Sequence, residues 1–183
     1  MQEDRRIRKT RQAIVKAFIE LLQEKSFQKI TVKDIAERAD IGKASFYRHF
    51  TDKYELAKYA VISKIDSFFQ TMPYDSIDQM LESDNLEVLQ NFIQELAPFR
   101  KIREDELNVD SLIKSYLAKY WKKSIYSMFP ATESLTPITA KLAAAVTLEL
   151  LDECSNKDVI AKPQFIKKQF RSLAMLGEFF QEK

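Results

Sequence analysis

The sequence predicts an all-α chain. Its 183 residues include only two glycines and five prolines, and residues that favour helices are abundant. In several long segments apolar residues recur every three or four positions, which is the period of a helix with one buried face. The chain is long enough to bury a substantial core. Its one cysteine, Cys154, excludes an intrachain disulfide and a thiolate metal cluster.

The first predicted helix ends near residue 25. Its apolar face consists of Ile14, Ala17, Phe18, Leu21 and Leu22. Residues 1–10, which precede this face, are predicted to be a polar arm with four basic side chains. We expect the arm to contact phosphate or a minor groove, and a solvated terminus is the alternative.

A short helix is predicted next, beginning after Thr31. Thr31 is a favourable N-cap, and Asp34 three residues later supplies the acidic half of a capping-box-like pair. One apolar face follows at helical spacing: Val32, Ile35, Ala36 and Ala39. Asp40 stands where this helix should end, and aspartate tolerates the left-handed backbone found at helix ends.

A second short helix is predicted over residues 43–49. It buries Phe46 and, just beyond it, Phe50. Its other faces carry hydrogen-bonding and cationic residues: Lys43, Ala44, Ser45, Tyr47, Arg48 and His49. Two short helices of this kind around a tight turn form a helix-turn-helix, whose second helix enters the major groove of DNA.

The run ITVKDIAERADIGKASFYRHFTDKYEL resembles the signature of the TetR/AcrR family of bacterial transcriptional regulators. Ala36, Ile41 and Phe46 fall where helix-turn-helix packing needs them, and the aromatic–x–x–Phe ending is typical of the family. Asp40 departs from the glycine that many members carry. The resemblance covers about the first third of the chain. It implies a homodimer that binds palindromic double-stranded DNA, most often as a repressor.

The predicted DNA contacts lie on and around the second short helix: Thr31, Lys43, Ala44, Ser45, Tyr47, Arg48, His49 and Lys53. Ala44 is small enough to let the helix reach a thymine methyl, whereas Arg48 has an alternative role in pairing with an acidic neighbour. Lys53 occupies the first turn of the next helix, where a cation opposes the helix dipole. A DNA phosphate would explain its position.

Charge is divided unevenly along the chain. Residues 1–55 carry 13 Lys and Arg against 9 Asp and Glu, and residues 56–183 carry 16 against 18. A basic N-terminal part on a nearly neutral remainder suits a DNA-binding domain attached to a globular one. We therefore predict a three-helix helix-turn-helix DNA-binding domain over residues 1–52 and a helical effector-binding and dimerisation domain over residues 53–183.

The second predicted domain is helical throughout. Asp52 and Glu55 are expected to cap a linking helix that continues to residue 72. Pro98 should kink or end the helix that begins near residue 85, and the charge-rich residues 100–108 are predicted to be an exposed connection. Further helices are predicted over residues 110–129, 136–156 and 163–180.

The resemblance implies a pocket in this domain for a small apolar or aromatic effector. The predicted lining residues are Asn91, Phe92, Glu95, Leu96, Phe99, Tyr116, Tyr120 and Trp121. Tyr120 and Trp121 point about a hundred degrees apart on a helix, so we expect only Tyr120 to line the cavity. In the alternative interpretation, this domain binds a protein partner instead of a small molecule.

Small residues on the last two helices predict close helix packing. The resemblance implies a homodimer interface made from Ala140, Ala144, Thr147, Leu151, Phe170, Ala174 and Gly177, and packing within one chain is the alternative.

The sequence argues against an enzyme, because it has no nucleophile elbow, phosphate-binding glycine loop or metal-ligand spacing. No cofactor or metal is therefore expected. No signal peptide and no membrane-spanning segment is recognised, so we expect a cytoplasmic protein.

Overall fold

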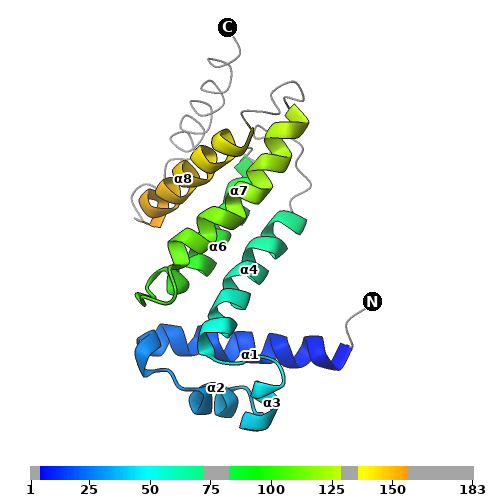
Figure 1. Ribbon diagram of the computed structural model, residues 1–183, viewed down its shortest axis with the longest axis vertical. Helices are drawn as coiled ribbons and strands as arrows, with labels where there is room; N and C mark the ends of the chain where they lie inside the picture. Colours follow the sequence, from blue (N-terminus) through cyan, green and yellow to red (C-terminus); the bar gives the residue numbers. More distant parts are fainter. Residues whose placement is uncertain (1–4, 72–82, 129–135, 156–183) are drawn as a thin grey trace, which may run out of the picture. The chain divides into compact units, whose positions relative to one another are not determined.

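The computed structural model describes residues 5–71, 83–128 and 136–155 (Figure 1). These ranges are all-α, as predicted, with no strand beyond one isolated antiparallel bridge between Glu104 and Leu107. The helices are α1 (Arg5–Glu24), η1 (Phe27–Lys29, a 3₁₀ turn), α2 (Val32–Arg38), α3 (Lys43–Tyr47), α4 (Lys53–Thr71), α6 (Ser83–Arg100), α7 (Val109–Met128) and α8 (Thr136–Ser155).

Contacts divide the chain into two compact units. The first unit comprises Met1–Ser63 and Pro98–Val109, and the second unit comprises Lys64–Ala97 and Asp110–Lys183. The helices α4, α6 and α7 therefore each contribute residues to both units. A functional domain boundary after residue 52 stays a prediction.

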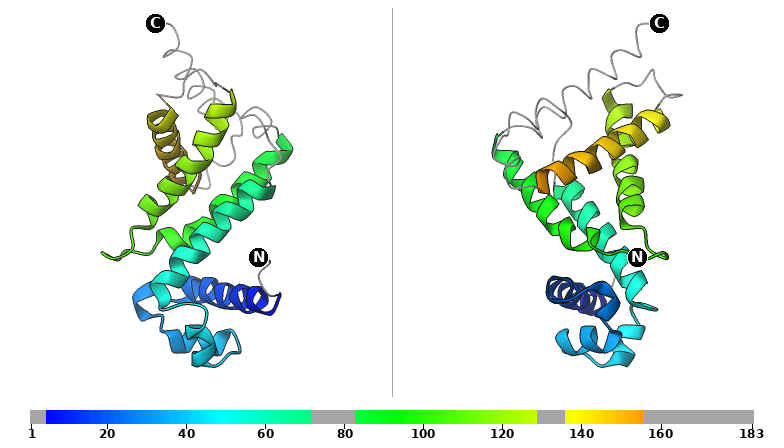
Figure 2. Two further views of the ribbon diagram at one scale, coloured as in Figure 1. Left: turned by 45° about the vertical axis from the view of Figure 1, so that its right-hand side comes forward. Right: turned by 90° about the vertical axis from the view of Figure 1, so that its left-hand side faces the viewer.

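In the first unit, α1 packs over α2, α3 and the beginning of α4 (Figures 1 and 2). The predicted apolar face of α1 is confirmed, because all five of its residues are buried. Phe18 lies at its centre, with ring centroids 6.0 Å from Phe27 and 6.2 Å from Phe99. The polar arm predicted for residues 1–10 is wrong for its described part, since α1 already begins at Arg5.

The start of α4 confirms the predicted cap. The Glu55 backbone N–H donates to Asp52 Oδ1 at 2.7 Å, so Asp52 closes the first turn of the helix. The Glu55 carboxylate, however, accepts from the backbone N–H and the hydroxyl of Thr51, at 2.6 and 2.7 Å. The reciprocal half of the capping box thus uses the residue before the expected one.

The connection after α6 differs from the expected exposed loop. Ile102, Leu107 and Val109 are buried, with at most 3% of their surface exposed. Backbone bonds from Ile102 N–H to Phe99 and from Leu107 N–H to Glu104 turn the chain twice. Each turn directs apolar residues inward and leaves the charged residues between them mostly outside, so a charge-rich segment still supplies core.

In the second unit, α6 lies alongside the later part of α4 (Figure 2). The rings of Phe68 and Phe92 stack at a centroid distance of 3.9 Å, and Lys64 pairs with Glu95 at 3.0 Å. Pro98 lies inside α6, which ends two residues later at Arg100. The helix predicted from residue 163 lies outside the described residues. Among those that are described, no helix has the length and apolar character that crossing a membrane requires.

Candidate nucleic-acid interface

The turn between α2 and α3 has the predicted construction. Asp40 adopts a φ of 53°, the left-handed conformation in which glycine is commonest and aspartate is tolerated. The Ile41 backbone N–H donates to the Ala36 carbonyl at 3.0 Å and so closes the end of α2. The α3 helix then begins at Lys43. The left-handed residue therefore redirects the chain between the two helices.

The α3 helix is fixed from beneath by aromatic packing. Phe46 is completely buried, and Phe50, just beyond the helix, is 3% exposed. Their ring centroids are 5.9 Å apart, and Phe50 lies 5.3 Å from Tyr59 on α4. Because both phenylalanines point inward, the orientation of α3 about its own axis is determined by the core.

The opposite face of α3 carries most of the predicted DNA contacts. Lys43, Ala44, Tyr47 and Arg48 are exposed, and Ser45 and His49 are half-buried. The Tyr47 ring is 57% exposed although it packs edge-on against Phe46. This face offers two cations, an aromatic hydroxyl and a small methyl group, which suit phosphates, base edges and thymine methyls respectively.

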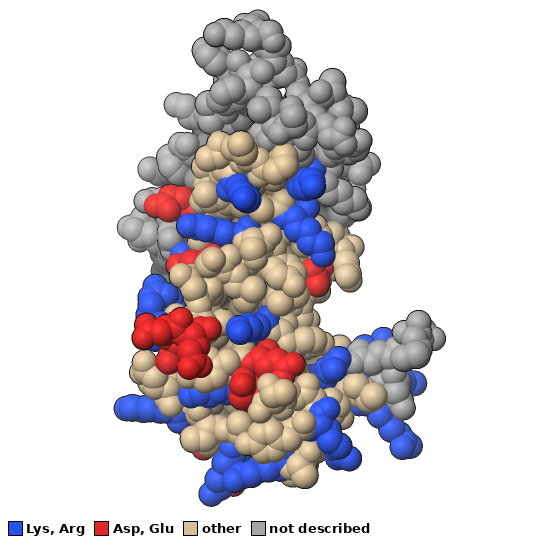
Figure 3. Space-filling model, viewed as in Figure 1, with Lys and Arg blue, Asp and Glu red and all other residues tan. Residues whose placement is uncertain are grey.

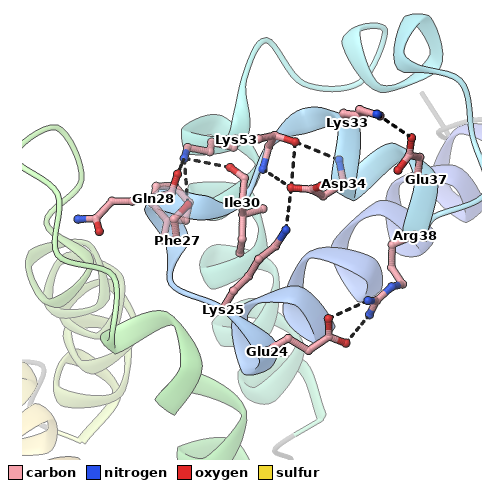
Figure 4. Close-up of polar contacts among 11 residues, drawn as sticks. Glu24, Lys25, Phe27, Gln28, Ile30, Lys33, Asp34, Glu37, Arg38 and Lys53 are labelled. Carbon is pink, nitrogen blue, oxygen red and sulfur yellow. Dashed lines mark hydrogen bonds and ion pairs between the residues drawn. The ribbon is translucent and has the colours of Figure 1, made fainter.

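Thr31 is engaged in the predicted capping box. Its hydroxyl accepts from the Asp34 backbone N–H at 3.2 Å, and its own N–H donates to Asp34 Oδ2 at 2.8 Å. Lys25 also reaches that carboxylate, at 2.8 Å (Figure 4). The bonds from Lys25 and Thr31 lower the pKa of Asp34 to about 2, because they favour its charged form.

Lys53 is held inside the first unit. Its ammonium donates to the carbonyls of Phe27, Gln28 and Ile30 (Figure 4). From the unfavourable position of Lys53 at a helix N-terminus, the sequence predicted a phosphate contact, whereas the structure shows backbone carbonyls as its partners. That position shows that the cation needs negative partners, but it does not identify them.

Sequence reasoning also missed a clasp between α1 and α2. Arg38 donates to both carboxylate oxygens of Glu24 at 2.8 Å, and it lies 3.6 Å from Glu20. The helical positions alone gave no sign of this pairing, because the partners are 14 and 18 residues apart in the chain. The clasp fixes α2 on α1 and does not involve α3.

Basic side chains gather on one side of the first unit, and this distribution favours contact with a polyanion there. In the view of Figure 3, Lys and Arg side chains lie along the end that carries α2 and α3 and around the beginning of α1, while most Asp and Glu gather elsewhere. The first turn of α1 adds the exposed Arg5, Arg6 and Arg8 and contains no acidic residue. Such a distribution attracts nucleic acid.

The predicted effector residues are not all brought together. Phe92 and Leu96 are buried in the second unit, Asn91 and Glu95 are exposed, and Tyr116, Tyr120 and Trp121 are half-buried. Phe99 belongs to the first unit, where it packs on Phe18.

Tyr120 and Trp121 contact different partners, as adjacent residues on a helix do, and the expectation that only Tyr120 lines a cavity stays a prediction. The Tyr120 ring stacks on Phe69 at 4.0 Å, and its hydroxyl donates to Asp66 at 2.5 Å. Burial, followed by the Asp66 bond, raises the pKa of Tyr120 to about 12. The Trp121 indole N–H instead donates to the Thr147 hydroxyl at 3.0 Å.

The small residues predicted for a homodimer interface face the interior of the second unit where they are described. Ala140, Ala144 and Thr147 are at most 8% exposed. Among the described side chains of α8, the large apolar ones that are exposed are Ile138 and Leu142, at 64% and 58%. Leu151 lies in α8 but its side chain is outside the described set, as are Phe170, Ala174 and Gly177.

The helix-turn-helix region is similar to known regulatory proteins. Residues 14–60 match the family model of the bacterial regulatory proteins, tetR family. An HTH-type transcriptional regulator of Bacillus subtilis (strain 168), YxbF, is 45% identical over 56 residues, which make up 30% of this chain and 15% of that protein. The chain thus spans well under two thirds of the length of this relative.

Two solved structures resemble most of the chain. The dihydroxyacetone kinase operon activator DhaS has a TM-score of 0.66 and 19% identity, over 91% of this chain and 97% of that one. NalD of Pseudomonas aeruginosa, described as the secondary repressor of the MexAB-OprM multidrug efflux pump, has a TM-score of 0.52 and 20% identity, over 90% and 96%. At these identities the likeness shows the fold: an N-terminal helix-turn-helix and a helical remainder.

Proposed function

Because residues 14–60 make this chain a member of the TetR family of bacterial transcriptional regulators, we propose that it binds a palindromic operator in double-stranded DNA as a homodimer. We further propose that it is a repressor released by a small apolar or aromatic effector. DNA binding would take place in the cytoplasm, where the operator lies.

The observation that carries the DNA-binding proposal is the two-sided character of α3. Phe46 and Phe50 anchor the helix from the inside, while Lys43, Tyr47 and Arg48 are exposed on its outer side. A short helix with exposed cations and hydrogen-bonding groups, held on a fixed support, is what major-groove recognition requires.

In vitro selection from random double-stranded DNA tests this proposal. We expect an inverted repeat whose half-sites are about 34 Å apart, or a multiple of that distance, because two symmetry-related α3 helices must reach the same face of the duplex. Recovery of a single asymmetric half-site would contradict the homodimer, and recovery of no sequence preference would contradict operator recognition.

Substitutions on α3 then assign the contacts. Lys43→Met and Tyr47→Ala should change the preferred sequence or weaken binding to the selected site. Lys114→Met, which removes an exposed cation from α7 in the second unit, is the matched control and should leave sequence preference unchanged.

For the homodimer, the outer face of α8 offers the better-supported surface. Ile138 and Leu142 lie four residues apart and are both more than half exposed, so they form one apolar stripe. An exposed apolar stripe on a helix suits association with a second copy. Ala140 and Ala144 would instead support α8 from within.

The effector proposal rests on the aromatic content of the second unit. The Phe68–Phe92 and Phe69–Tyr120 stacks present apolar rings, and the Tyr120 hydroxyl with Asp66 supplies a polar group to orient a ligand. A flat apolar or aromatic molecule is the class that such groups recognise.

A ligand screen by thermal shift, followed by operator binding, tests the effector. A ligand should weaken operator binding by the factor by which operator weakens ligand binding, about 5–150-fold. Tyr120→Ala should spoil this response and leave operator binding intact. If no ligand in a broad screen changes operator affinity and a protein partner does, the protein-partner interpretation replaces the small-molecule one. Of the two structural neighbours, one is described as an activator and one as a repressor, so a reporter gene must decide the sign.

A further inference from the structure

The ammonium of Lys53 occupies a nest of backbone carbonyls. Its Nζ lies 2.9 Å from the carbonyl oxygen of Phe27, 3.3 Å from that of Gln28 and 3.1 Å from that of Ile30. Figure 4 shows the side chain reaching from the first residue of α4 to the end of η1. All of these atoms belong to the first unit.

These contacts use the full hydrogen-bonding capacity of the side chain. A lysine ammonium has three N–H donors and no acceptor, and three carbonyls accept from it. The ammonium also lies 4.5 Å from the ring centre of Phe27 and 5.7 Å from that of Tyr54, which adds cation–π attraction. No N–H is left over for a phosphate oxygen while this arrangement holds.

The nest also explains why a cation stands at the start of a helix. Positive charge there is opposed by the helix dipole, so Lys53 would be unfavourable without compensation. The three carbonyl oxygens carry partial negative charge and supply that compensation within the protein. A compact ammonium fits three converging oxygens, whereas the planar fork of arginine matches a carboxylate or phosphate.

The nest joins α4 to the start of α2. The residue that follows Ile30 is Thr31, the N-cap of α2, and the capping box with Asp34 is itself held by Lys25, the residue after α1. Lys53 therefore ties the first residue of α4 to a segment that is bonded to both α1 and α2. Beyond Ser63 the same α4 continues into the second unit.

We propose that Lys53 is a positioning residue, which couples α4 to the helix-turn-helix, and not a phosphate ligand. When α4 shifts, the nest obliges the η1 corner and the start of α2 to shift with it. This role in controlling DNA binding rests on the proposed function, whereas the nest itself does not.

The salt dependence of DNA binding separates the two roles. Each phosphate contact contributes about 0.9 to the slope of log Kobs against log salt concentration on duplex DNA. The probe is mixed-sequence double-stranded DNA, since non-specific binding needs no operator. Lys53→Met should lower affinity without changing the slope, and Lys114→Met in the second unit controls for the lost charge. A slope reduced by about 0.9 in Lys53→Met would show a phosphate contact and overturn the proposal.

Hydrogen exchange on the same variant tests the nest itself. Loss of the ammonium should speed exchange of the backbone N–H groups of Lys29 and Ile30, which close the η1 turn. Unchanged exchange at both amides would mean that Lys53 holds nothing in place, and the proposal would fail.

Acetylation of the wild-type protein keeps the test available if Lys53→Met does not fold. Modification must first break the bonds to the ammonium, so in the free protein Lys53 should react roughly tenfold more slowly than exposed Lys43, and adding DNA should not slow Lys53 further. Reaction of Lys53 at the rate of Lys43 in the free protein, followed by protection on adding DNA, contradicts the proposal. If the wild-type protein binds no DNA, the proposed function fails, but slow acetylation and exchange still support the nest.

Discussion

Within each of the two units, a different mixture of contacts stabilises the helices. In the first unit, polar and charged groups fasten the ends of short helices: the Thr31–Asp34 capping box, the Arg38–Glu24 clasp and the Lys53 nest. Both units also pack aromatic rings, but the pairs of the first unit meet edge-on or tilted, such as Phe18 with Phe27, whereas the second unit stacks rings face to face on long helices, as in Phe68 on Phe92. Polar bonds of the second unit, such as Tyr120 to Asp66, join the sides of long helices and not the ends of short ones.

This difference suits two tasks. Hydrogen bonds and ion pairs between helix ends permit one geometry, and reading base edges requires a helix held at a fixed angle. Apolar contact is non-directional, so helices packed through stacked rings have fewer fixed partners to break when they shift, which a domain that responds to an effector would need. The predictions below test where this contrast holds.

The largest effect is expected at Phe46, the buried support of α3. Phe46→Ala should lower the free energy of unfolding of the first unit by about 3–5 kcal/mol, because it leaves a large cavity. Its neighbour Tyr47 is exposed and makes only an edge-on ring contact with Phe46, so Tyr47→Ala should cost about 1 kcal/mol or less and yet impair DNA binding. Chemical denaturation together with DNA binding checks the pair. Equal destabilisation by the two substitutions would mean that α3 does not have the two distinct faces described.

The next effect concerns the outer face of α8. If Leu142 is buried between two copies, Leu142→Glu loses about 2 kcal/mol of apolar burial in each, and the dimer dissociation constant should rise on the order of 1,000-fold. Sedimentation equilibrium measures this change, with Lys141→Gln as the control on the same helix. A dimer that survives Leu142→Glu unchanged would place the interface elsewhere.

A smaller effect tests the directional contacts of the first unit. Thr31→Ala removes the N-cap of α2 and should cost about 1 kcal/mol of unfolding free energy. Thr10→Ala makes the same chemical change within α1, where the hydroxyl bonds to the Arg6 carbonyl, and should cost less than about 0.5 kcal/mol. If urea denaturation gives the two substitutions the same cost, the cap is not what fastens α2.

Acid should weaken the first unit through Asp34. Its folded pKa of about 2 lies below its ordinary value, so its charge stabilises the fold above about pH 4, and this contribution is lost as the pH falls towards 2. Asp34→Asn should therefore lower stability at neutral pH and flatten the acid limb of a stability profile. Glu37→Gln, on the exposed side of α2, should leave that limb in place.

Alkali should weaken the second unit through Tyr120. Its folded pKa of about 12 lies above its ordinary value of 10, so its stabilisation is complete below about pH 10 and is lost as the pH rises towards 12. Tyr120→Phe should remove this alkaline component, which the absorbance of tyrosinate follows directly. A profile identical to that of the wild type would show that the bond to Asp66 does not persist in solution.

Much of the first unit was predictable because its signals are local. The capping residues, the left-handed Asp40 and the inward Phe46 each depend on neighbours within a few positions. Local rules of helix capping and spacing are enough for these features. The same rules predicted the all-α class and the helix-turn-helix.

Features that depend on distant partners could not be read in this way. The position of Lys53 indicated that it needs negative partners, but the carbonyls that it binds lie 23 to 26 residues earlier in the chain. On α8, apolar residues occupy more than one face, and spacing alone does not tell which face turns inward. The structure buries Ala140 and Ala144 and exposes Ile138 and Leu142. Ile102 and Leu107 were overlooked because charged residues surround them.

The bond between Trp121 and Thr147 has a practical consequence. Trp121 is the only tryptophan in the chain, and its indole N–H is held by a hydroxyl that is itself buried and bonded to the Ala143 carbonyl at 2.7 Å. Its fluorescence therefore originates wholly in the second unit and depends on the separation of α7 and α8. A shift in emission wavelength on adding a compound would report a rearrangement of these helices without any label, and one on adding DNA would show that the two units communicate.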